Sequence, residues 1–149
     1  GSLNLSDTDE YRLDAQVGFL LRRANQRHLA IFAKAVDGLT PTQFATLAKL
    51  SEHGEMSQND LGRRTAMDAA TMKGVVDRLA RKGLVATRSD QADLRRVIVS
   101  LTPAGSDMSA ATIPIARDVT AATLAPLGPD EQATLLALLA KMADTPPQK

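Results

Sequence analysis

The sequence predicts a mainly α-helical fold: a winged helix-turn-helix core, with a small β-hairpin as its wing, flanked by N- and C-terminal dimerisation helices. Two short helical patterns come in tandem, at 57–64 and 68–83, and two β-rich runs follow directly, at 84–88 and 97–101. A polar stretch rich in charge separates these two runs. Such a helix pair can offer its second helix to the DNA major groove, while a basic hairpin beside it reaches a neighbouring groove.

We expect three parts along the 149 residues, a length that suits one domain with helical extensions. The winged lobe would take residues 38–103. A helical dimerisation lobe would combine 8–37 with 104–145. The ends, 1–7 and 146–149, would be flexible tails.

The segment 8–37 contains no proline and a single glycine, and its apolar residues recur at steps of three and four. This periodicity predicts one long amphipathic helix, with His28 on the apolar stripe. Thr40-Pro41-Thr42-Gln43 begins the next helix, because Thr40 can cap it, Pro41 suits the first helical position and Gln43 can complete a capping box. His53-Gly54 would end that helix.

The tandem pair follows. Ser57 and Asp60 have a capping spacing for its first helix, and Asp68 can cap the second. In the second helix the apolar residues occupy positions i, i+3, i+4 and i+7, namely Met72, Val75, Val76 and Leu79. The opposite side carries small residues near its start and then a long cation, which suits a helix that presses close to base edges.

Thr102-Pro103 begins a further helix, which Pro114 is expected to kink or interrupt. The last helix begins at Gly128-Pro129, and its apolar stripe consists of Leu135, Leu138, Leu139 and Met142. A small winged core cannot cover the terminal helices, so we expect a second copy of the chain to bury these residues. An intramolecular helical bundle in a monomer is the alternative.

Charge is concentrated in one segment although the whole chain carries only +1. Between Gly62 and Arg96 there are nine basic and four acidic residues, whereas the remainder has nine basic and 13 acidic residues. A basic segment on an acidic body is typical of a protein that presents one face to phosphate. A solvated surface is the alternative explanation of the same charges.

The composition argues against several classes of protein. With no cysteine, disulfides and thiolate metal sites are excluded, and we expect neither a metal nor a cofactor. No run of about 18 apolar residues or signal segment is present, so we expect a cytoplasmic protein, on the nucleoid when bound to its operator. The sequence has no glycine-rich phosphate loop and no nucleophile motif, so we do not expect an enzyme.

These residues resemble the MarR family of bacterial transcriptional regulators. The resemblance is strong from Leu39 to Gly105, and its most specific motif is Asp93-Leu94-Arg95-Arg96 followed by Leu101-Thr102. It implies a homodimer that binds a palindromic operator, usually as a repressor, and that a small molecule releases from DNA. The segment 65–76 also resembles a branch of the family that controls breakdown of aromatic or N-heteroaromatic acids. Members that sense thiols or zinc need cysteine or histidine clusters, which this chain lacks.

Given this motif, we interpret Arg95 as a minor-groove contact that Asp93 orients by a bidentate pair. Ordinary solvated positions are the alternative for both these residues and the following ones. The candidates for base contacts in the second helix of the pair are Ala70, Thr71 and Lys73. The candidates for phosphate contacts are Arg63, Arg64 and Arg78, although Arg78 can instead pair with Asp77 or Asp93.

The effector site is expected between the first helix, the second helix near Phe44 and the fifth helix. Arg22 and His28 would together donate to a carboxylate in this mostly apolar pocket. This predicts a small aromatic carboxylate as the effector. His28 as a satisfied core or dimer-seam residue is the alternative.

A different class of function also fits the pattern. The winged helix could serve only for protein–protein association, with its basic face docked on an acidic partner and without sequence-specific DNA binding. Gly74 and the small face around Ala69 and Ala70 favour entry into a DNA groove over that alternative.

Overall fold

The structure is a computed structural model that describes residues 10–147. Its elements in chain order are η2 (Leu13–Ala15), α1 (Val17–Ala35), α2 (Pro41–His53), β1 (Met56–Ser57), α3 (Gln58–Arg64), α4 (Ala69–Arg81), β2 (Val85–Ser89), β3 (Val97–Leu101), α5 (Pro103–Leu124) and α6 (Pro129–Asp144). The predicted class, mainly α-helical with a winged helix-turn-helix, is confirmed. No described helix has the length and apolar character that crossing a bilayer requires.

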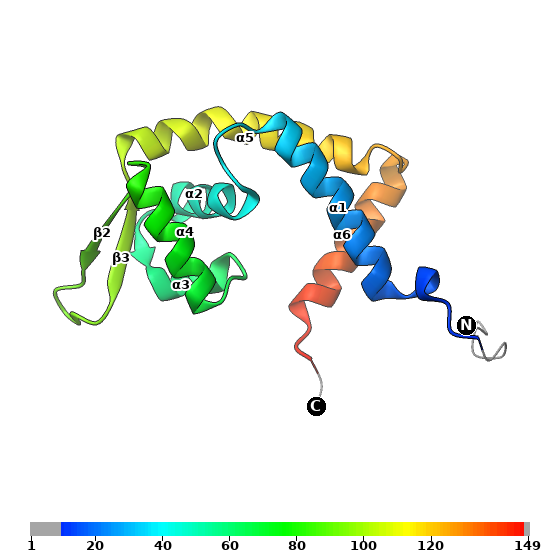
Figure 1. Cartoon of the computed structure of the whole chain (residues 1–149), viewed down its shortest axis with the longest axis horizontal. Coiled ribbons are helices and arrows are strands. Elements are labelled where there is room, and N and C mark those ends of the chain that lie inside the picture. The colour runs from blue at the N-terminus through cyan, green and yellow to red at the C-terminus, as the bar shows by residue number, and fades with distance from the viewer. Residues whose placement is uncertain (1–9, 148–149) are drawn as a thin grey trace.

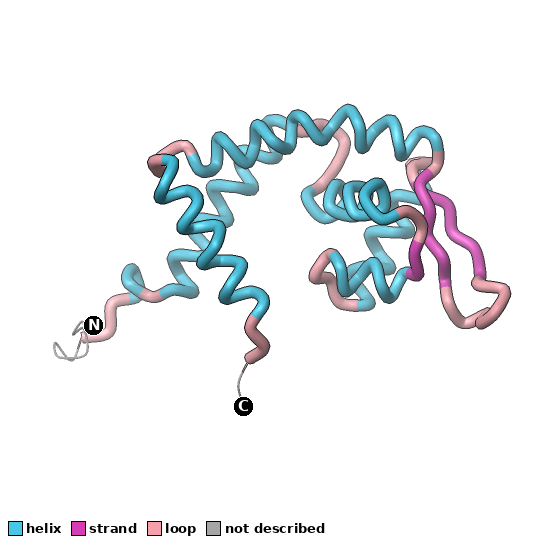
Figure 2. The backbone as a smooth tube through the Cα atoms, turned by 180° about the vertical axis from the view of Figure 1, so that it is seen from behind, coloured by secondary structure: helices cyan, strands magenta, loops and turns pink. Residues whose placement is uncertain are grey.

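Two groups of elements lie on the same side of the long helix α5, one near each of its ends (Figure 1). We call α2, β1, α3, α4, β2 and β3 the winged lobe, and α1, α6 and the C-terminal half of α5 the helical lobe. Figure 2 shows the same arrangement from behind, with the three strands at one end of the molecule and α1 crossing α6 at the other. Helix α5 contacts both α1 and α2, so it connects the two lobes.

The wing is part of a three-stranded sheet rather than an isolated hairpin. The β2–β3 pair is antiparallel with Val85 opposite Leu101, and its strands lie within one residue of the predicted runs. The short strand β1 adds to the other edge of β3, with Met56 opposite Val99. The sequence analysis did not predict β1, because two residues are too few to show a period of two. Strand β1 anchors the start of α3 to the wing.

The predicted helix caps are confirmed in the winged lobe. Thr40 Oγ1 accepts from Gln43 N at 3.2 Å and Gln43 Oε1 accepts from Thr40 N at 3.2 Å, which is a complete capping box. Ser57 Oγ accepts from Asp60 N at 3.2 Å, and Asp68 Oδ1 accepts from Thr71 N at 2.7 Å. These side chains satisfy amide groups that the helices leave free at their N-termini.

One expectation about the long helices was wrong, and another was wrong in part. Helix α1 begins at Val17 and not at residue 8; residues 13–15 form a 3-10 turn, while residues 1–9 lie outside the described part. Residues 10–15 are exposed, and a helix without a face to bury gains little from tertiary packing. Pro114 does not interrupt α5, which continues from Pro103 to Leu124. The expected tail 1–7 also falls outside the described residues.

The core lies between α2, α3, α4, β3 and the facing side of α5. Leu47, Leu61, Leu79 and Val99 have no exposed surface, and Val119 of α5 is 2% exposed. Complete burial of one such side chain contributes about 1.5–3 kcal/mol to folding. The predicted stripe of α4 is buried in this core, since Met72, Val75, Val76 and Leu79 are each at most 4% exposed.

A close backbone contact joins α5 to the end of α4. A Cβ atom on Gly105 would overlap the carbonyl oxygen of Leu84, so only glycine fits at this position of α5. Gly18, in contrast, lies on the exposed surface of α1, where a Cβ atom would have no neighbour within 4 Å. A side chain at position 105 would therefore disrupt packing, whereas a side chain at position 18 would not.

We predict that Gly105→Ala lowers the free energy of unfolding by about 1–3 kcal/mol, because the backbone around Leu84 must shift to admit the methyl group. Gly18→Ala is the matched control and should raise stability by up to about 1 kcal/mol, since alanine is the better helix former. Thermal and urea denaturation measure both effects. A Gly105→Ala variant as stable as the parent would contradict the contact.

Candidate DNA-binding face and effector cavity

Helix α4 presents its unburied side to solvent. The apolar stripe fixes the rotation of the helix in the core, so Ala69, Ala70, Thr71 and Lys73 are all exposed. The N-terminal end of α4 and the tip of the β2–β3 hairpin both point away from α5 (Figure 1). The predicted base-contact residues of α4 thus lie on the same side of the molecule as the wing.

Lys73 is engaged within α4. Its Nζ donates to Asp77 Oδ2 at 3.0 Å, an exposed ion pair between residues four apart. Such a pair contributes little to stability, so Lys73 can exchange this carboxylate for an acceptor on DNA at low cost. Arg78 pairs with neither Asp77 nor Asp93, and has no ionic partner in the part of the chain that the structure describes. Arg78 is therefore available to a phosphate.

The turn between α3 and α4 sets how these helices cross. Ala66 has a φ of +58°, and Gly62 lies where a Cβ would come within 3.1 Å of the Met67 carbonyl oxygen. Both features allow the chain to reverse in a short turn.

Of the two predicted phosphate contacts on α3, Arg63 forms an ion pair with Asp60, whereas Arg64 is exposed and has no such partner in the described residues.

Two aspartates organise the tip of the wing. Asp90 Oδ1 accepts from Ala92 N at 3.0 Å and Asp90 Oδ2 accepts from Arg96 Nη1 at 2.9 Å. Asp93 Oδ1 accepts from both the backbone N and the Nε of Arg95, at 3.1 and 3.2 Å. The expected bidentate pair is therefore corrected: one carboxylate oxygen serves both donors, because the two residues share a tight turn. The terminal nitrogens of Arg95 remain free for DNA.

The wing presents Arg95 and retains Arg96. The side chain of Arg95 is 92% exposed, while Arg96 is 47% exposed and held by Asp90. The hydrogen bonds from the Arg95 side chain and backbone lower the pKa of Asp93 below its ordinary value. Asp93 is therefore ionised at every pH above its ordinary pKa. Its ion pair with Arg95 is lost only when the pH falls below that ordinary value.

A second feature lies in the helical lobe, where α1, α5 and α6 meet around a cavity of about 350 Å³. His28 and Asn25 of α1 and Thr120 and Thr123 of α5 are its polar lining, and leucines from all three helices make up most of the rest. His28 Nδ1 lies 2.9 Å from Thr123 Oγ1, a hydrogen bond that orients the ring. The cavity is mostly apolar with a few polar groups, as small-molecule sites are.

The structure does not bring the three expected effector residues together. His28 lines the cavity, but Arg22 does not, and it lies exposed on α1. Phe44 belongs to the core of the winged lobe, where its ring lies 6.3 Å from that of Phe32. The expected wall near Phe44 is replaced by α6, which crosses α1 in Figure 2 and contributes three leucines to the cavity lining. The periodicity of α6 alone could not indicate this direction.

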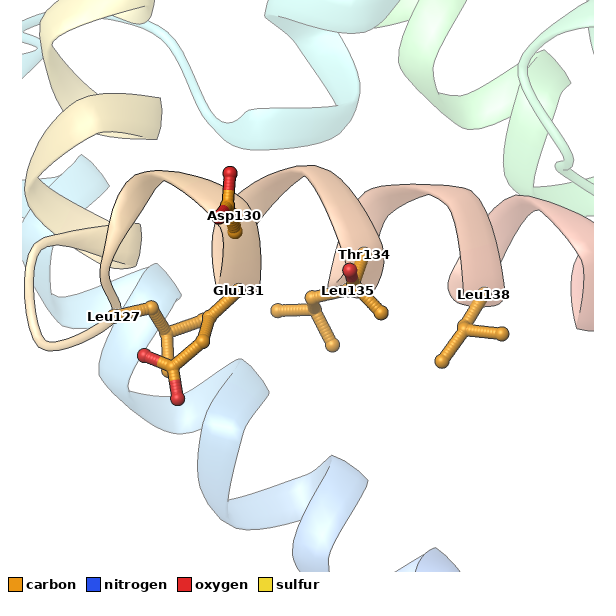
Figure 3. Close-up of a pocket in the computed structure, with 6 residues that line it drawn as sticks. All are labelled: Leu127, Asp130, Glu131, Thr134, Leu135 and Leu138. Atoms are coloured by element: carbon orange, nitrogen blue, oxygen red, sulfur yellow. The ribbon is translucent and has the colours of Figure 1, made fainter.

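The four expected dimer residues lie on α6 but differ in exposure. Leu135 and Leu139 line the cavity and are half-buried. Leu138 and Met142 are 54% and 53% exposed. Figure 3 shows an open side of α6 on which Leu135 and Leu138 lie with Leu127, which precedes the helix, and with Asp130, Glu131 and Thr134. The single chain thus leaves part of this stripe without cover.

Sequence reasoning missed the residues that close the C-terminal end of α5. Arg27 of α1 donates from Nη2 to Ala122 O at 2.8 Å and from Nε to Thr123 O at 3.2 Å. Gln132 Nε2 donates to Leu124 O at 3.1 Å and to Leu127 O at 2.9 Å. The bonds of Arg27 have no local signal in the sequence, because they depend on the packing of α1 against α5. Within residues 10–147 no His, Asp and Glu cluster suits a metal ion.

Known proteins match this chain over most of its length. A sequence model of the MarR family matches residues 39–97. The HTH-type transcriptional repressor NicR of Pseudomonas putida is 44% identical over 141 residues, which cover 93% of this chain and 89% of NicR. The resemblance that the sequence analysis described is thereby confirmed.

Two solved structures share the fold. BpsR of Bordetella bronchiseptica, described with a mechanism by which 6-hydroxynicotinic acid regulates its DNA binding, has 41% identity and a TM-score of 0.88, covering 92% of this chain and 99% of its own. PcaV of Streptomyces coelicolor, solved with its natural ligand, has 31% identity and a TM-score of 0.85, covering 91% and 97%. With the winged helix-turn-helix, the exposed wing arginine and these matches, the chain belongs to the MarR family of transcriptional regulators.

Proposed function

We propose that this protein is a ligand-responsive repressor that binds a palindromic operator as a homodimer and is released by a small aromatic acid. The observation that carries the proposal is the exposed guanidinium of Arg95 at the wing tip, whose Nε is held by Asp93 while its terminal nitrogens point to solvent, on the same side of the molecule as the small outward face of α4. Ala70, Thr71 and Lys73 would contact bases in the major groove, and Arg95 would enter the minor groove. Arg63, Arg64 and Arg78 would contact phosphates.

The homodimer is supported by apolar residues that the single chain leaves exposed. They lie on all three helices of the helical lobe: Val17, Leu20, Leu21, Leu29, Ile115, Leu136, Leu138 and Met142. Exposed apolar surface of this extent is typical of an interaction site. Two-fold pairing through it would place two α4 helices about 34 Å apart, one turn of duplex, which matches a palindrome.

The effector is proposed to bind beside His28, where a planar body fits among leucines and a carboxylate can accept from the imidazole or from Asn25. Arg22 would have to act from outside this cavity. The regulation of BpsR by 6-hydroxynicotinic acid supports this ligand class. Because α5 runs from this cavity to the winged lobe, an effector that prefers one orientation of α5 would change the spacing of the α4 helices and so release DNA.

The protein would act by binding rather than by catalysis, in the cytoplasm and on the nucleoid when the operator is occupied. The alternative is a winged-helix module that associates only with an acidic protein. Gly74 favours the DNA-binding function. It is half-buried on α4 next to Arg78, and because it has no side chain, the backbone of the helix can come closer to the floor of a groove. A salt-dependent mobility shift confined to one palindrome separates the two functions.

We predict that Arg95→Ala lowers affinity for a duplex selected in vitro by the wild-type protein roughly tenfold or more, as for other groove arginines. The melting temperature should stay that of the parent, because the side chain contacts only its own turn. Arg117→Ala, which removes the same charge from the exposed side of α5, is the control and should leave affinity unchanged. Fluorescence anisotropy over a range of salt measures each variant. Equal binding by Arg95→Ala and wild type would reject the wing contact.

We predict that replacing Leu138 and Leu139 with aspartate yields monomers or aggregates, since unpaired charge in an apolar interface is costly. Leu138→Asp alone is the more specific variant, because Leu139 also lines the cavity. Ser51→Asp adds the same charge at an exposed position of α2 and should remain dimeric. Sedimentation velocity reports the oligomeric state. A stable dimer of Leu138→Asp would show that the subunits meet elsewhere.

We predict that benzoate, hydroxybenzoate or pyridine carboxylate ligands, 6-hydroxynicotinic acid included, raise the melting temperature and release the duplex. His28→Ala should weaken this response roughly tenfold or more, the worth of a hydrogen bond to a charged group. Arg22→Ala tests whether a second cation takes part from outside the cavity. No response to any member of the panel, or a full response in both variants, would place the effector in another class or another site.

A further inference from the structure

Two short segments lead out of the winged lobe, and both form hydrogen bonds with the three residues that directly follow helix α4. The first connection is the segment 36–40 between α1 and α2, and the second is Thr102 between β3 and α5. The three residues are Lys82, Gly83 and Leu84, which lie directly after α4. Both places where the chain passes between the winged lobe and α1 or α5 therefore contact the residues that follow α4.

Lys82 holds the first connection through its side chain alone. Its Nζ donates to Gly38 O at 2.7 Å and to Gln43 Oε1 at 3.0 Å. Gln43 is 5% exposed, and the same Oε1 accepts from Thr40 N in the capping box of α2. Gly38 has a φ of +81°, so the carbonyl that Lys82 contacts belongs to the turn at which the chain leaves α1. One ammonium thus joins α4, the turn and the first residues of α2.

The second connection combines one side-chain hydroxyl with backbone groups. Thr102 Oγ1 donates to Gly83 O at 2.6 Å, and Thr102 N donates to Leu84 O at 3.1 Å. Gly105 then packs against the same Leu84 carbonyl. The buried contact between Gly105 and Leu84 leaves no room for a side chain, so the start of α5 and the residues after α4 are closely packed. The first connection is the adjustable one, since a lysine side chain is flexible and its bonds are single contacts.

We propose that Lys82 is a positioning residue that sets the orientation of α4 relative to α1, and that exchange of its bond to Gly38 accompanies the change between the DNA-binding and released states. This inference rests on the proposed ligand-responsive function. A ligand can shift an equilibrium only through contacts that differ between two states. The bond from Lys82 to Gly38 joins the end of α4 to the turn after α1, the helix that carries His28, so a ligand that moves α1 would act on this bond.

The test compares Lys82→Met, which keeps the aliphatic stem, with Lys82→Arg, which can still donate to the same carbonyl. Lys34→Met is the matched control: Lys34 lies in the last turn of α1, is exposed and has no polar partner in the described residues. Amide hydrogen exchange over residues 36–44 is the first readout and requires neither DNA nor effector. Exchange there should become several-fold faster in Lys82→Met, and should match the parent in Lys82→Arg and Lys34→Met.

The second readout is the ratio of duplex affinities without and with 6-hydroxynicotinic acid, for which allosteric proteins commonly give about 5–150. Lys82→Met should bring this ratio toward one while the variant still binds the duplex, and Lys82→Arg should restore it. Unchanged exchange in Lys82→Met, or a lower melting temperature with an unaltered ratio, would overturn the proposal. If the wild type itself does not respond to the acid, the proposed effector fails, and hydrogen exchange together with affinity for the selected duplex then decides the role of Lys82.

Discussion

The burial of one side of α4 is the constraint on which the DNA-binding face depends. Met72, Val75, Val76 and Leu79 contact a core built from α2, α3 and β3, so the helix cannot rotate without exposing them. Burial of one such side chain contributes about 1.5–3 kcal/mol to the free energy of folding, far more than the exposed ion pair of Lys73 and Asp77. Packing therefore decides which residues face outward, and those residues need contribute nothing to stability. This separation leaves the outward side free to vary with the operator.

Carboxylates accompany the cations of the DNA-binding face in a regular way. Asp60 pairs with Arg63, Asp77 with Lys73 and Asp93 with Arg95, whereas Arg64 and Arg78 have no ionic partner in the described chain. The paired cations are held in defined positions but are weakly bound, because their carboxylates are exposed. In the proposed complex, the cations without a partner would add non-specific attraction to phosphate. The proposed face would thus combine oriented contacts with non-specific ones.

The winged lobe could be predicted from the sequence because its signals are local. Thr40 with Gln43, Asp68 with Thr71 and the stripe of α4 each lie within a few residues of one another, and each was confirmed. Strand β1 escaped prediction because its pairing with β3 joins residues more than 40 positions apart. The cavity escaped for the same reason: His28 of α1 contacts Thr123 of α5, 95 positions later in the chain, and neither helix carries a local signal of its partner. The start of α1 was predicted too early, because the residues before Val17 are exposed and have no packing to stabilise a helix, which their sequence pattern does not reveal.

The bonds of Arg27 to Ala122 and Thr123 have a consequence for synthesis of the chain. They join residues 95 and 96 positions apart, so α1 leaves the ribosome long before its partner in α5 exists. At 5–20 residues per second this interval lasts roughly 5–20 s. The winged lobe, whose contacts are closer in the chain, can fold within that time, whereas the apolar residues of α1 remain without a partner. During synthesis, the contacts between α1 and the C-terminal end of α5 therefore form late.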